Sequence, residues 1–462
     1  MTFIIIIAVI FSIGALLYKT PDHSYNAKFG NSYEFLSSAN FGFSATGTRA
    51  LTKSMSHTNV ALFGPTGSGK TSTVILGSAF SLAKGKSSII FNDVSGEIFE
   101  KTSAYLASKN YKILRLDFSN SQNSEAFNPL TDCKTISDIQ KVALLIIRNS
   151  IGETKGDVFW EQSAVMLLSL FIRYLIFHTE PEFHSLKNVL RLVEKFAVDG
   201  KEVDKMFSRT NDDDLLAAYK STIVVGEKTL QSIVATARTA LNLFTDPEVC
   251  KTTATNSIDF NLLRNEPVAL YVCNPLKDLM YFKPLSALFF QSLFNYVLSR
   301  IPGKNERSIF FVMDEAATMR FPALSTTISN IRKFNSGILL CMQDENALIS
   351  QYGVAEAHQI KTNCGCQIYL KGQPIHTSTE LSKILGRYSY KDEKEIERVR
   401  ELMTPDEIRM CDDAIILINN KAPLKCRMVP YYKNIWISRH TTLPPYQLSE
   451  KVISEPALIP FY

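Results

Sequence analysis

The stretch that decides the fold runs from Asn59 to Thr71 and reads NVALFGPTGSGKT. An apolar run ends at a glycine, a glycine-rich loop follows, and Lys-Thr leads into the helix-forming segment 72–83. This is the pattern G-x-x-x-x-G-K-T between a strand and a helix, the context that a phosphate-binding loop requires. The alternative is a chance glycine turn. It accounts less well for the strand, the spacing, Lys-Thr and the helix occurring together.

Each part of this loop has a role in holding phosphates. Glycines let backbone amides turn inward around the phosphates, and the helix N-terminus adds the positive end of its dipole. Lys70 is expected to reach the β- and γ-phosphates, and the Thr71 hydroxyl is expected to hold Mg²⁺. We therefore predict that ATP and Mg²⁺ bind at Gly64, Pro65, Thr66, Gly67, Ser68, Gly69, Lys70 and Thr71.

Bulk composition sets limits on the class of protein. The chain has 462 residues, is 45% hydrophobic and carries a formal net charge of +5, which predicts about two to three domains. With 50 basic against 45 acidic residues, composition alone does not indicate a nucleic-acid binder. The eight cysteines are scattered, and Cys364 with Cys366 lacks the two-pair spacing of a zinc site. We interpret them as reduced cytosolic thiols, mostly in the core.

The N-terminus is expected to be a membrane anchor. Residues 2–18, TFIIIIAVIFSIGALLY, carry no charge, and Lys19 ends the run. Their length is near the lower limit for a membrane span. A signal peptide would need a basic start and a small-x-small cleavage site, and a buried core helix is the other alternative. Lys19, Lys28 and Arg49 follow the run, so the positive-inside rule predicts a single-pass protein whose body is cytoplasmic.

The remaining chain alternates strands and helices around a helical insertion. Apolar runs at 60–63, 88–93 and 112–117 alternate with helical segments, which indicates a parallel doubly wound sheet. From 131 to 261 helical spacing dominates, as in Ala164, Leu167, Leu168, Phe171 and Leu175. We predict an α/β fold with these parts: anchor 1–20, nucleotide-binding domain 21–130 and 262–432, inserted all-α domain 131–261, and tail 433–462.

Two later strands carry further candidate residues. Residues 308–315, SIFFVMDE, form an apolar strand that ends in Asp-Glu. In this interpretation Asp314 holds the Mg²⁺ shell and Glu315 polarises the attacking water. The pattern is weak alone and strong when paired with the phosphate-binding loop. Residues 337–342 form the neighbouring strand, and Gln343 ends it where a sensor of the γ-phosphate would lie.

Three charged residues have two possible roles each. Arg332 precedes the strand that ends at Gln343. Its guanidinium could stabilise transition-state charge on a neighbouring subunit's nucleotide, or it could be a solvated helix end. Asp93 ends a strand beside the loop, and Glu97 opens the next helix. They could lie near Mg²⁺ or a substrate channel, or Asp93 could cap the helix while Glu97 favours its first turn.

The chain resembles the TraG/TraD family of type IV secretion coupling proteins, the ATPases of conjugative DNA transfer. The resemblance rests on the N-terminal apolar segment, the phosphate-binding loop, and a series of motifs that covers nearly the whole chain in order: Asp93–Glu97, Glu100–Leu106, Phe127–Leu130, Phe159-Trp160, Met313–Glu315, Gln343 with Tyr352-Gly353, and Met403–Glu407. The two nucleotide motifs occur in many ATPases; Asn128-Pro129-Leu130, Phe159-Trp160 and Thr404-Pro405-Asp406-Glu407 are more specific.

The resemblance implies a RecA-like P-loop NTPase core with an all-α domain, assembled as a homo-hexamer on the bacterial inner membrane. It also implies ATP-driven movement of a relaxase-bound single DNA strand into a type IV secretion channel. In this family an arginine about eleven residues before the sensor glutamine acts in trans, and Arg332 matches it. The chain departs from the family in showing one span instead of two, Ser95 where many members have Lys, and no long acidic tail.

Three other functions remain open at this point. Members of the same family also recruit protein effectors to the secretion channel without DNA. A DNA-pumping ATPase of chromosome segregation would usually add a long linker and a terminal winged helix, for which the chain has no room. In a membrane-tethered nucleotide-binding scaffold, replacing Glu315 with Gln would not change ATP hydrolysis. The same variant of a coupling ATPase would bind ATP without hydrolysing it.

Overall fold

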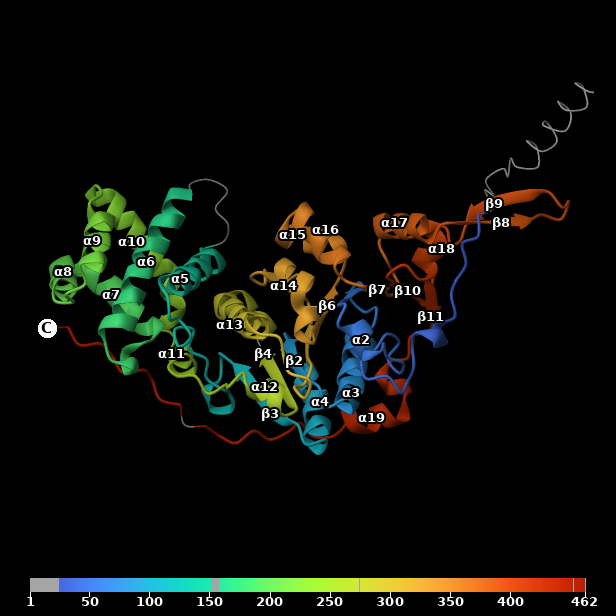
Figure 1. Cartoon of the computed structure of the whole chain (residues 1–462), viewed down its shortest axis with the longest axis horizontal. Coiled ribbons are helices and arrows are strands. Elements are labelled where there is room, and N and C mark those ends of the chain that lie inside the picture. The colour runs from blue at the N-terminus through green and yellow to red at the C-terminus, as the bar shows by residue number, and fades with distance from the viewer. Residues whose placement is uncertain (1–24, 152–157, 274, 452, 462) are drawn as a thin grey trace, which may run out of the picture.

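The computed structural model describes residues 25–151, 158–273, 275–451 and 453–461. Its centre is a sheet in the order β11-β10-β7-β1-β6-β5-β2-β4-β3 (Figure 1). The strands from β7 to β3 run parallel, and β10 pairs antiparallel with both β7 and β11. The strands are β1 Val60–Phe63, β2 Ser88–Asp93, β3 Lys112–Asp117, β4 Val268–Cys273, β5 Ile309–Met313, β6 Ser336–Met342, β7 Cys366–Tyr369, β10 Ala414–Ile418 and β11 Leu424–Cys426.

Helices cover both faces of this sheet, so its central strands are continuous apolar runs. Two successive residues of β5 show the helical layers on the two faces of the sheet. The ring centroid of Phe311 lies 5.2 Å from that of Phe294 on one face, and the ring centroid of Phe310 lies 5.1 Å from that of Phe43 on the other. One face packs against α13 Leu279–Ser299, α14 Leu324–Asn330 and α16 Val354–Thr362, and the other against α3 Leu76–Lys84, α4 Glu97–Ser108 and α19 Ile435–Thr441 (Figure 1). The predicted α/β core is confirmed.

A separate group of helices lies beyond the β3 edge of the sheet (Figure 1). It consists of α5 Ile136–Ile151, α6 Val158–His178, α7 Leu186–Val198, α8 Gly200–Ser208, α9 Asp213–Ile223, α10 Glu227–Leu241 and α11 Pro247–Thr252. The expected stripe on α6, from Ala164 to Leu175, is fully buried against its neighbours. Within the described residues, α6 is the one helix whose length and apolar composition would suffice to cross a membrane. It packs as the central helix of this group.

The remaining elements are short or lie near the ends. They are α2 Lys53–Ser56, α12 Leu262–Asn265, α15 Glu345–Tyr352, α17 Ile375–Leu385, α18 Pro405–Met410 and the turns η1 Ser32–Glu34, η2 Thr71–Ile75, η3 Ser121–Asn123, η4 Pro181–Phe183, η5 Asn242–Thr245, η6 Leu276–Asp278, η7 Ile331–Phe334 and η8 Tyr431–Lys433. An unpredicted hairpin, β8 Arg387–Lys391 with β9 Glu397–Glu401, projects at one end (Figure 1). Its largely charged, exposed strands bury no apolar face, which explains why hydrophobic patterning missed it.

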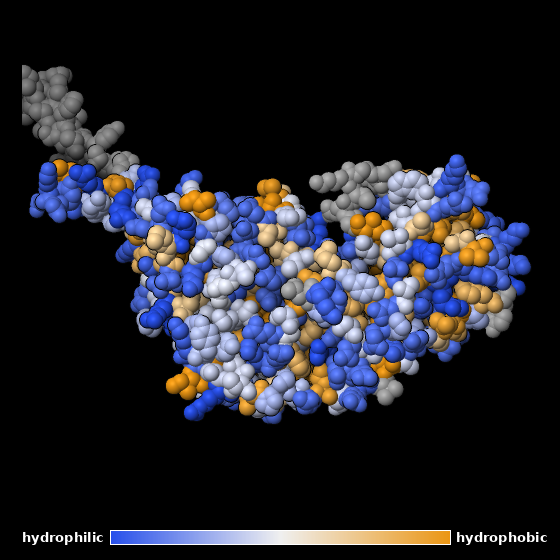
Figure 2. Space-filling model, turned by 180° about the vertical axis from the view of Figure 1, so that it is seen from behind, coloured by the Kyte–Doolittle hydropathy of each residue, from blue (hydrophilic) through white to orange (hydrophobic). Residues whose placement is uncertain are grey.

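The surface and the termini complete the description. Figure 2 shows apolar residues scattered among hydrophilic ones on that face, in keeping with the near-neutral composition. The predicted anchor, residues 1–20, lies outside the described residues. All eight cysteines are free, and all but Cys411 are buried. Among the residues that the structure describes, no three His, Cys, Asp or Glu side chains gather into a metal-binding group.

Candidate nucleotide-binding site

Four neighbouring strands deliver the candidate residues to one edge of the sheet. In the order β1-β6-β5-β2, the residues that follow the strand ends are Gly64, Gln343, Asp314 and, as the last residue of β2, Asp93. The register pairs Phe63 with Met342, and the Gly64 amide donates to the Met342 carbonyl at 3.0 Å. The start of the loop and Gln343 are therefore adjacent. Ligands of open parallel sheets bind at this carboxyl edge.

The loop from Gly64 to Thr71 has a backbone that only glycine adopts easily at two points. Gly67 and Gly69 have φ of 79° and 97°, in the left-handed region. A Cβ on Gly64 would lie 2.4 Å from the Ser68 hydroxyl oxygen. That hydroxyl is buried and has no hydrogen-bond partner among the described residues. An unpaired buried donor inside a glycine-rich concavity fits a phosphate oxygen. Pro65 is half-buried and Thr66 is exposed.

Lys70 lies at the centre of the site and is 7% exposed. Its Nζ donates to the Gly64 carbonyl at 2.8 Å and lies 3.4 Å from Glu315 Oε1. Lys70 thus connects the phosphate-binding loop to the turn after β5, the strand two places away from β1 in the sheet. Thr71 comes next and begins the π-helical turn η2, where the amides of Val74 and Ile75 both donate to the Lys70 carbonyl.

Asp314 and Glu315 follow β5 in a tight turn. The side-chain Nδ2 of Asn92 donates to the Asp314 carbonyl at 2.8 Å, and the backbone amide of Glu315 donates to Asp314 Oδ1 at 3.1 Å. Burial, and then the nearby carboxylates of Glu315 and Asp93, raise the pKa of Asp314 to about 7, although Lys70 opposes the shift. Glu315 has φ of 48°, a conformation that costs free energy for a non-glycine residue and often marks a functional position.

Asp93 is buried and faces the first turn of α4. Its carboxylate accepts hydrogen bonds from the amides of Ile98 at 3.3 Å and Phe99 at 2.7 Å. Burial raises its pKa to about 6 in spite of these bonds, and Glu97, half-buried in the same turn, adds to the shift. Asp93 therefore caps α4 and also repels Asp314. A carboxylate cluster of this kind is relieved by a cation, and Mg²⁺ commonly uses one or two carboxylates together with phosphates and waters.

Gln343 and Arg332 lie at opposite ends of β6. Gln343 is exposed and follows Met342, the last residue of the strand, whereas Arg332 is exposed in η7, which precedes its first residue. The seven residues of β6 span roughly 23 Å at about 3.3 Å per residue. Arg332 therefore cannot reach the phosphate-binding loop of its own chain. The structure brings together the loop, Asp314, Glu315, Gln343 and Asp93, and it leaves Arg332 apart.

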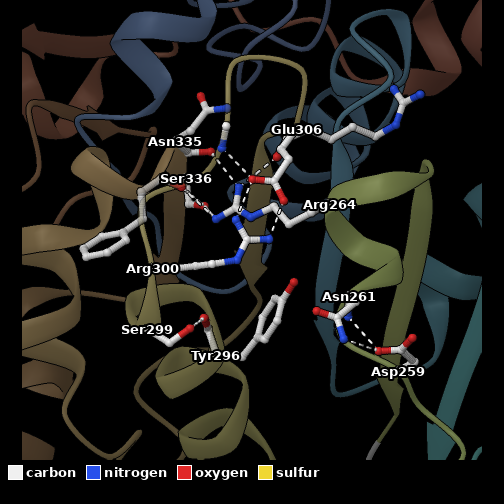
Figure 3. Close-up of polar contacts among 12 residues, drawn as sticks. Asp259, Asn261, Arg264, Tyr296, Ser299, Arg300, Glu306, Asn335 and Ser336 are labelled. Carbon is white, nitrogen blue, oxygen red and sulfur yellow. Dashed lines mark hydrogen bonds and ion pairs between the residues drawn. The ribbon is translucent and has the colours of Figure 1, made fainter.

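A residue that sequence reasoning missed holds the turn that carries Arg332. Arg264, in α12, is 4% exposed and donates to the Phe334 carbonyl at 2.7 Å, the Arg307 carbonyl at 2.8 Å and the Ser336 hydroxyl at 3.2 Å (Figure 3). Asn335 ends the turn with φ of 51°. Nothing in the sequence around Arg264 marks it, because its acceptors come from segments distant in the chain.

The two edges of the sheet carry opposite charge. At the amino edge, burial together with Lys53, Arg332 and Arg264 lowers the pKa of His57 to about 4. Burial, and then the nearby charge of Arg307, lower the pKa of Lys53 as well. At the carboxyl edge, burial and neighbouring carboxylates raise the pKa of Asp93 and of Asp314. Of the basic side chains at the amino edge, Arg332 is exposed, Lys53 and Arg307 are half-buried and Arg264 is buried.

A pH-dependent stability should follow from Asp314. A carboxyl whose pKa is higher in the folded chain binds its proton more tightly when folded, so its stabilising contribution is present at low pH and is lost as pH rises from about 4 through about 7. In EDTA, Asp314→Asn should increase the free energy of unfolding at pH 8 by on the order of 3 kcal/mol and should have little effect at pH 4. Urea unfolding at both pH values measures this. The exposed Asp412→Asn is the control, and equal effects of the two variants would contradict the assignment.

Arg264→Ala should loosen the Arg332 turn. Removing the guanidinium leaves the Arg307 carbonyl without its side-chain donor and the Phe334 carbonyl with the Ser336 hydroxyl, at 3.0 Å, as its remaining one. The loss should cost about 2–4 kcal/mol of stability and speed hydrogen exchange of residues 331–336. The neighbouring Arg300 forms an exposed ion pair with Glu306 (Figure 3). Arg300→Ala should therefore cost no more than about 1 kcal/mol and leave exchange of the turn unchanged.

Comparison with known proteins identifies a family and relatives that the chain resembles. The family model for conjugative DNA transfer by the type IV secretory system matches residues 17–456. VirD4 of Rhizobium radiobacter is 26% identical over 392 residues, and VirD4 of Agrobacterium fabrum (strain C58) is 24% identical over 411, covering 77% and 81% of the chain. The matches cover 54% and 59% of those proteins, so the chain spans little more than half their length.

The fold is also that of a solved coupling protein. The structure of plasmid coupling protein TrwB in complex with ADP and Mg²⁺ superposes with a TM-score of 0.67 over 89% of this chain and 96% of that one, at 16% identity. The resemblance inferred from the motifs is confirmed. Because the family model covers nearly all of its length, the chain belongs to the family of type IV secretory proteins of conjugative DNA transfer, the coupling proteins that include VirD4 and TrwB.

Proposed function

We propose that the chain is an ATPase that couples a relaxase bound to single-stranded DNA to a type IV secretion channel and drives its translocation during conjugation. Membership of the DNA-transfer family supports the substrate class. The observation that carries the ATPase activity is the convergence of Lys70, Glu315 and Gln343 on the phosphate-binding loop. A TrwB structure contains ADP and Mg²⁺, which supports the same cofactors here.

In the proposed reaction each side chain has one task. Lys70 leaves the Gly64 carbonyl and Glu315 and neutralises charge on the β- and γ-phosphates. Glu315, released from that ion pair, orients and polarises the attacking water. Gln343, which lies beside Gly64, contacts the γ-phosphate and so acts as its sensor. Thr71 and Asp314 would hold Mg²⁺, which supplies positive charge to the phosphate oxygens when it is bound.

Arg332 completes the site of a neighbouring subunit in this proposal. Its position at the amino edge excludes action on its own nucleotide, and the basic amino edge is complementary to the carboxyl edge where phosphates would lie. A contact between two different faces closes into a ring when the rotation per subunit allows it. We infer a homo-hexamer anchored in the bacterial inner membrane by residues 1–20, with residues 21–432 and the tail 433–462 in the cytoplasm.

The ATPase assignment is tested by Glu315→Gln. This variant should bind ATP with Mg²⁺ and lose hydrolysis by at least about 100-fold, as expected when a group that acts in the transition state is removed. Lys70→Ala should lose binding as well. Fluorescent-nucleotide binding and phosphate release on the full chain in detergent separate the two effects. Unchanged phosphate release in Glu315→Gln would favour a nucleotide-binding scaffold.

The choice of substrate is tested in the same assay. Single-stranded DNA should increase the rate of phosphate release several-fold and the effect should weaken with added salt, because backbone phosphates dominate such binding. If neither single- nor double-stranded DNA stimulates hydrolysis, the alternative function is favoured. In that alternative, the ATPase recruits protein effectors to the secretion channel without DNA.

Mixed oligomers test the role of Arg332. Arg332→Ala and Lys70→Ala should each lose at least about 100-fold of the hydrolysis rate. When the two variants are mixed, some interfaces combine an intact loop with an intact Arg332, so part of the activity should return. Lys333→Ala, which removes the adjacent exposed cation, is the control and should behave as the unaltered chain. If mixing restores nothing, Arg332 is a solvated helix end.

A further inference from the structure

The end of the chain crosses from the nucleotide-binding sheet to the helical group (Figure 1). After α19 the described residues, up to 451 and from 453 to 461, have no regular secondary structure. The Tyr446 amide donates to the Ser103 hydroxyl on α4 at 3.0 Å, and the Lys451 amide donates to the Gln122 carbonyl at 3.0 Å. Lys451 also forms an ion pair with Glu125. The tail is thus attached to the sheet side before it reaches α7.

On α7 a buried amide side chain holds the tail by its backbone. Asn188 is fully buried; its Nδ2 donates to the Ala457 carbonyl at 2.8 Å, and its Oδ1 accepts from the Ile459 amide at 3.0 Å. These two groups lie two residues apart, so the side chain pairs with the tail as a neighbouring strand would. One turn further along α7, Arg191 Nη2 donates to the Ile459 carbonyl at 3.2 Å.

Two side chains of the tail enter the same face. Ile459 is 3% exposed and joins the apolar core, while Leu458 beside it is 49% exposed. The ring of Phe461 lies under Arg191 at 5.2 Å and Lys195 at 5.6 Å from its centroid. Positions 188, 191 and 195 share one face of a helix. The face therefore recognises an extended backbone with an aliphatic residue two positions before an aromatic one.

Two features distinguish this arrangement from ordinary packing of a chain end. Between 453 and 461 the one described side chain that is buried is Ile459, which is little apolar burial to hold a segment permanently. Asn188 Oδ1, in contrast, has the Ile459 amide as its partner and no other within the described residues. Nδ2 of the same side chain also donates to the Phe183 carbonyl at 2.8 Å, so it is Oδ1 that depends on the tail. A buried acceptor without a partner is costly, and a bound peptide backbone removes that cost.

We propose that the face of α7 formed by Asn188, Arg191 and Lys195 is a binding site for an extended peptide of the pattern aliphatic-x-aromatic. The chain's own C-terminal segment is its resident and dissociable ligand. While seated, the segment ties the helical group to α4, the helix that Asp93 caps. This inference does not depend on the proposed ATPase or on its substrate.

The test uses a fluorescein-labelled peptide with the sequence of residues 453–461 and the full chain. Ile459→Asp unseats the tail and leaves the site intact, so the peptide should bind this variant at least ten-fold more tightly than the unaltered chain, whose tethered tail competes at a high effective concentration. Leu458→Asp, altered at the exposed neighbour, is the matched control and should behave as the unaltered chain. Equal binding to all three chains, or no binding to Ile459→Asp, would overturn the proposal.

Two further measurements address the site itself and the fold of the variants. Adding Asn188→Leu to Ile459→Asp should reduce peptide binding at least ten-fold, and a peptide with Asp at the position of Ile459 should not bind; retained binding in either case contradicts the recognition described above. In the unaltered chain, hydrogen exchange of the Ile459 amide should be faster than exchange of the α7 amides and nearly independent of denaturant. Exchange only by global unfolding would show the tail to be an integral part of the fold.

Discussion

The parallel pairing of β1, β6, β5 and β2 is the constraint on which the rest of the site depends. Parallel strands all present their carboxyl ends at one edge, so residues from four separate stretches of sequence meet there. The bond from the Gly64 amide to the Met342 carbonyl fixes the register between the loop and β6, the strand that Gln343 follows. A slip of one residue would reverse the faces of every side chain on the strand and would misplace both Gly64 and Gln343.

The same sheet separates charges that the proposed ATPase requires at different places. Acidic residues and Lys70 gather at the carboxyl edge, while Lys53, Arg264 and Arg332 gather at the amino edge. The length of β6 places Arg332 too far from the phosphate-binding loop of its own chain to reach it. Hydrolysis that depends on Arg332 would therefore depend on assembly, and each nucleotide would report on the position of the next subunit.

Two segments whose contacts the sequence did not predict connect this core to the helical group. Arg264 lies where the chain returns from the helices to β4, and it fastens the turn that carries Arg332. The tail runs back in the other direction, from α19 past α4 to α7. The helical group is therefore connected to the core at two separate places, through a buried guanidinium at one and an extended peptide at the other.

The sequence by itself determined the strands, the glycine-rich loop, the Asp-Glu strand end, the stripe of α6 and the family, because each depends on local spacing or on an ordered series of motifs. The tertiary structure alone decided that Asp93 caps α4 while repelling Asp314, that Lys70 pairs with Glu315, and that Arg264 and Asn188 have their particular acceptors and donors. The hairpin β8–β9 was missed because it buries no apolar face. The physical reason is the same in each case. The periodicity of apolar residues shows which face of an element is buried. Hydrogen bonds between residues distant in the chain, and the pKa shifts caused by burial, arise only when the folded sheet brings those residues together.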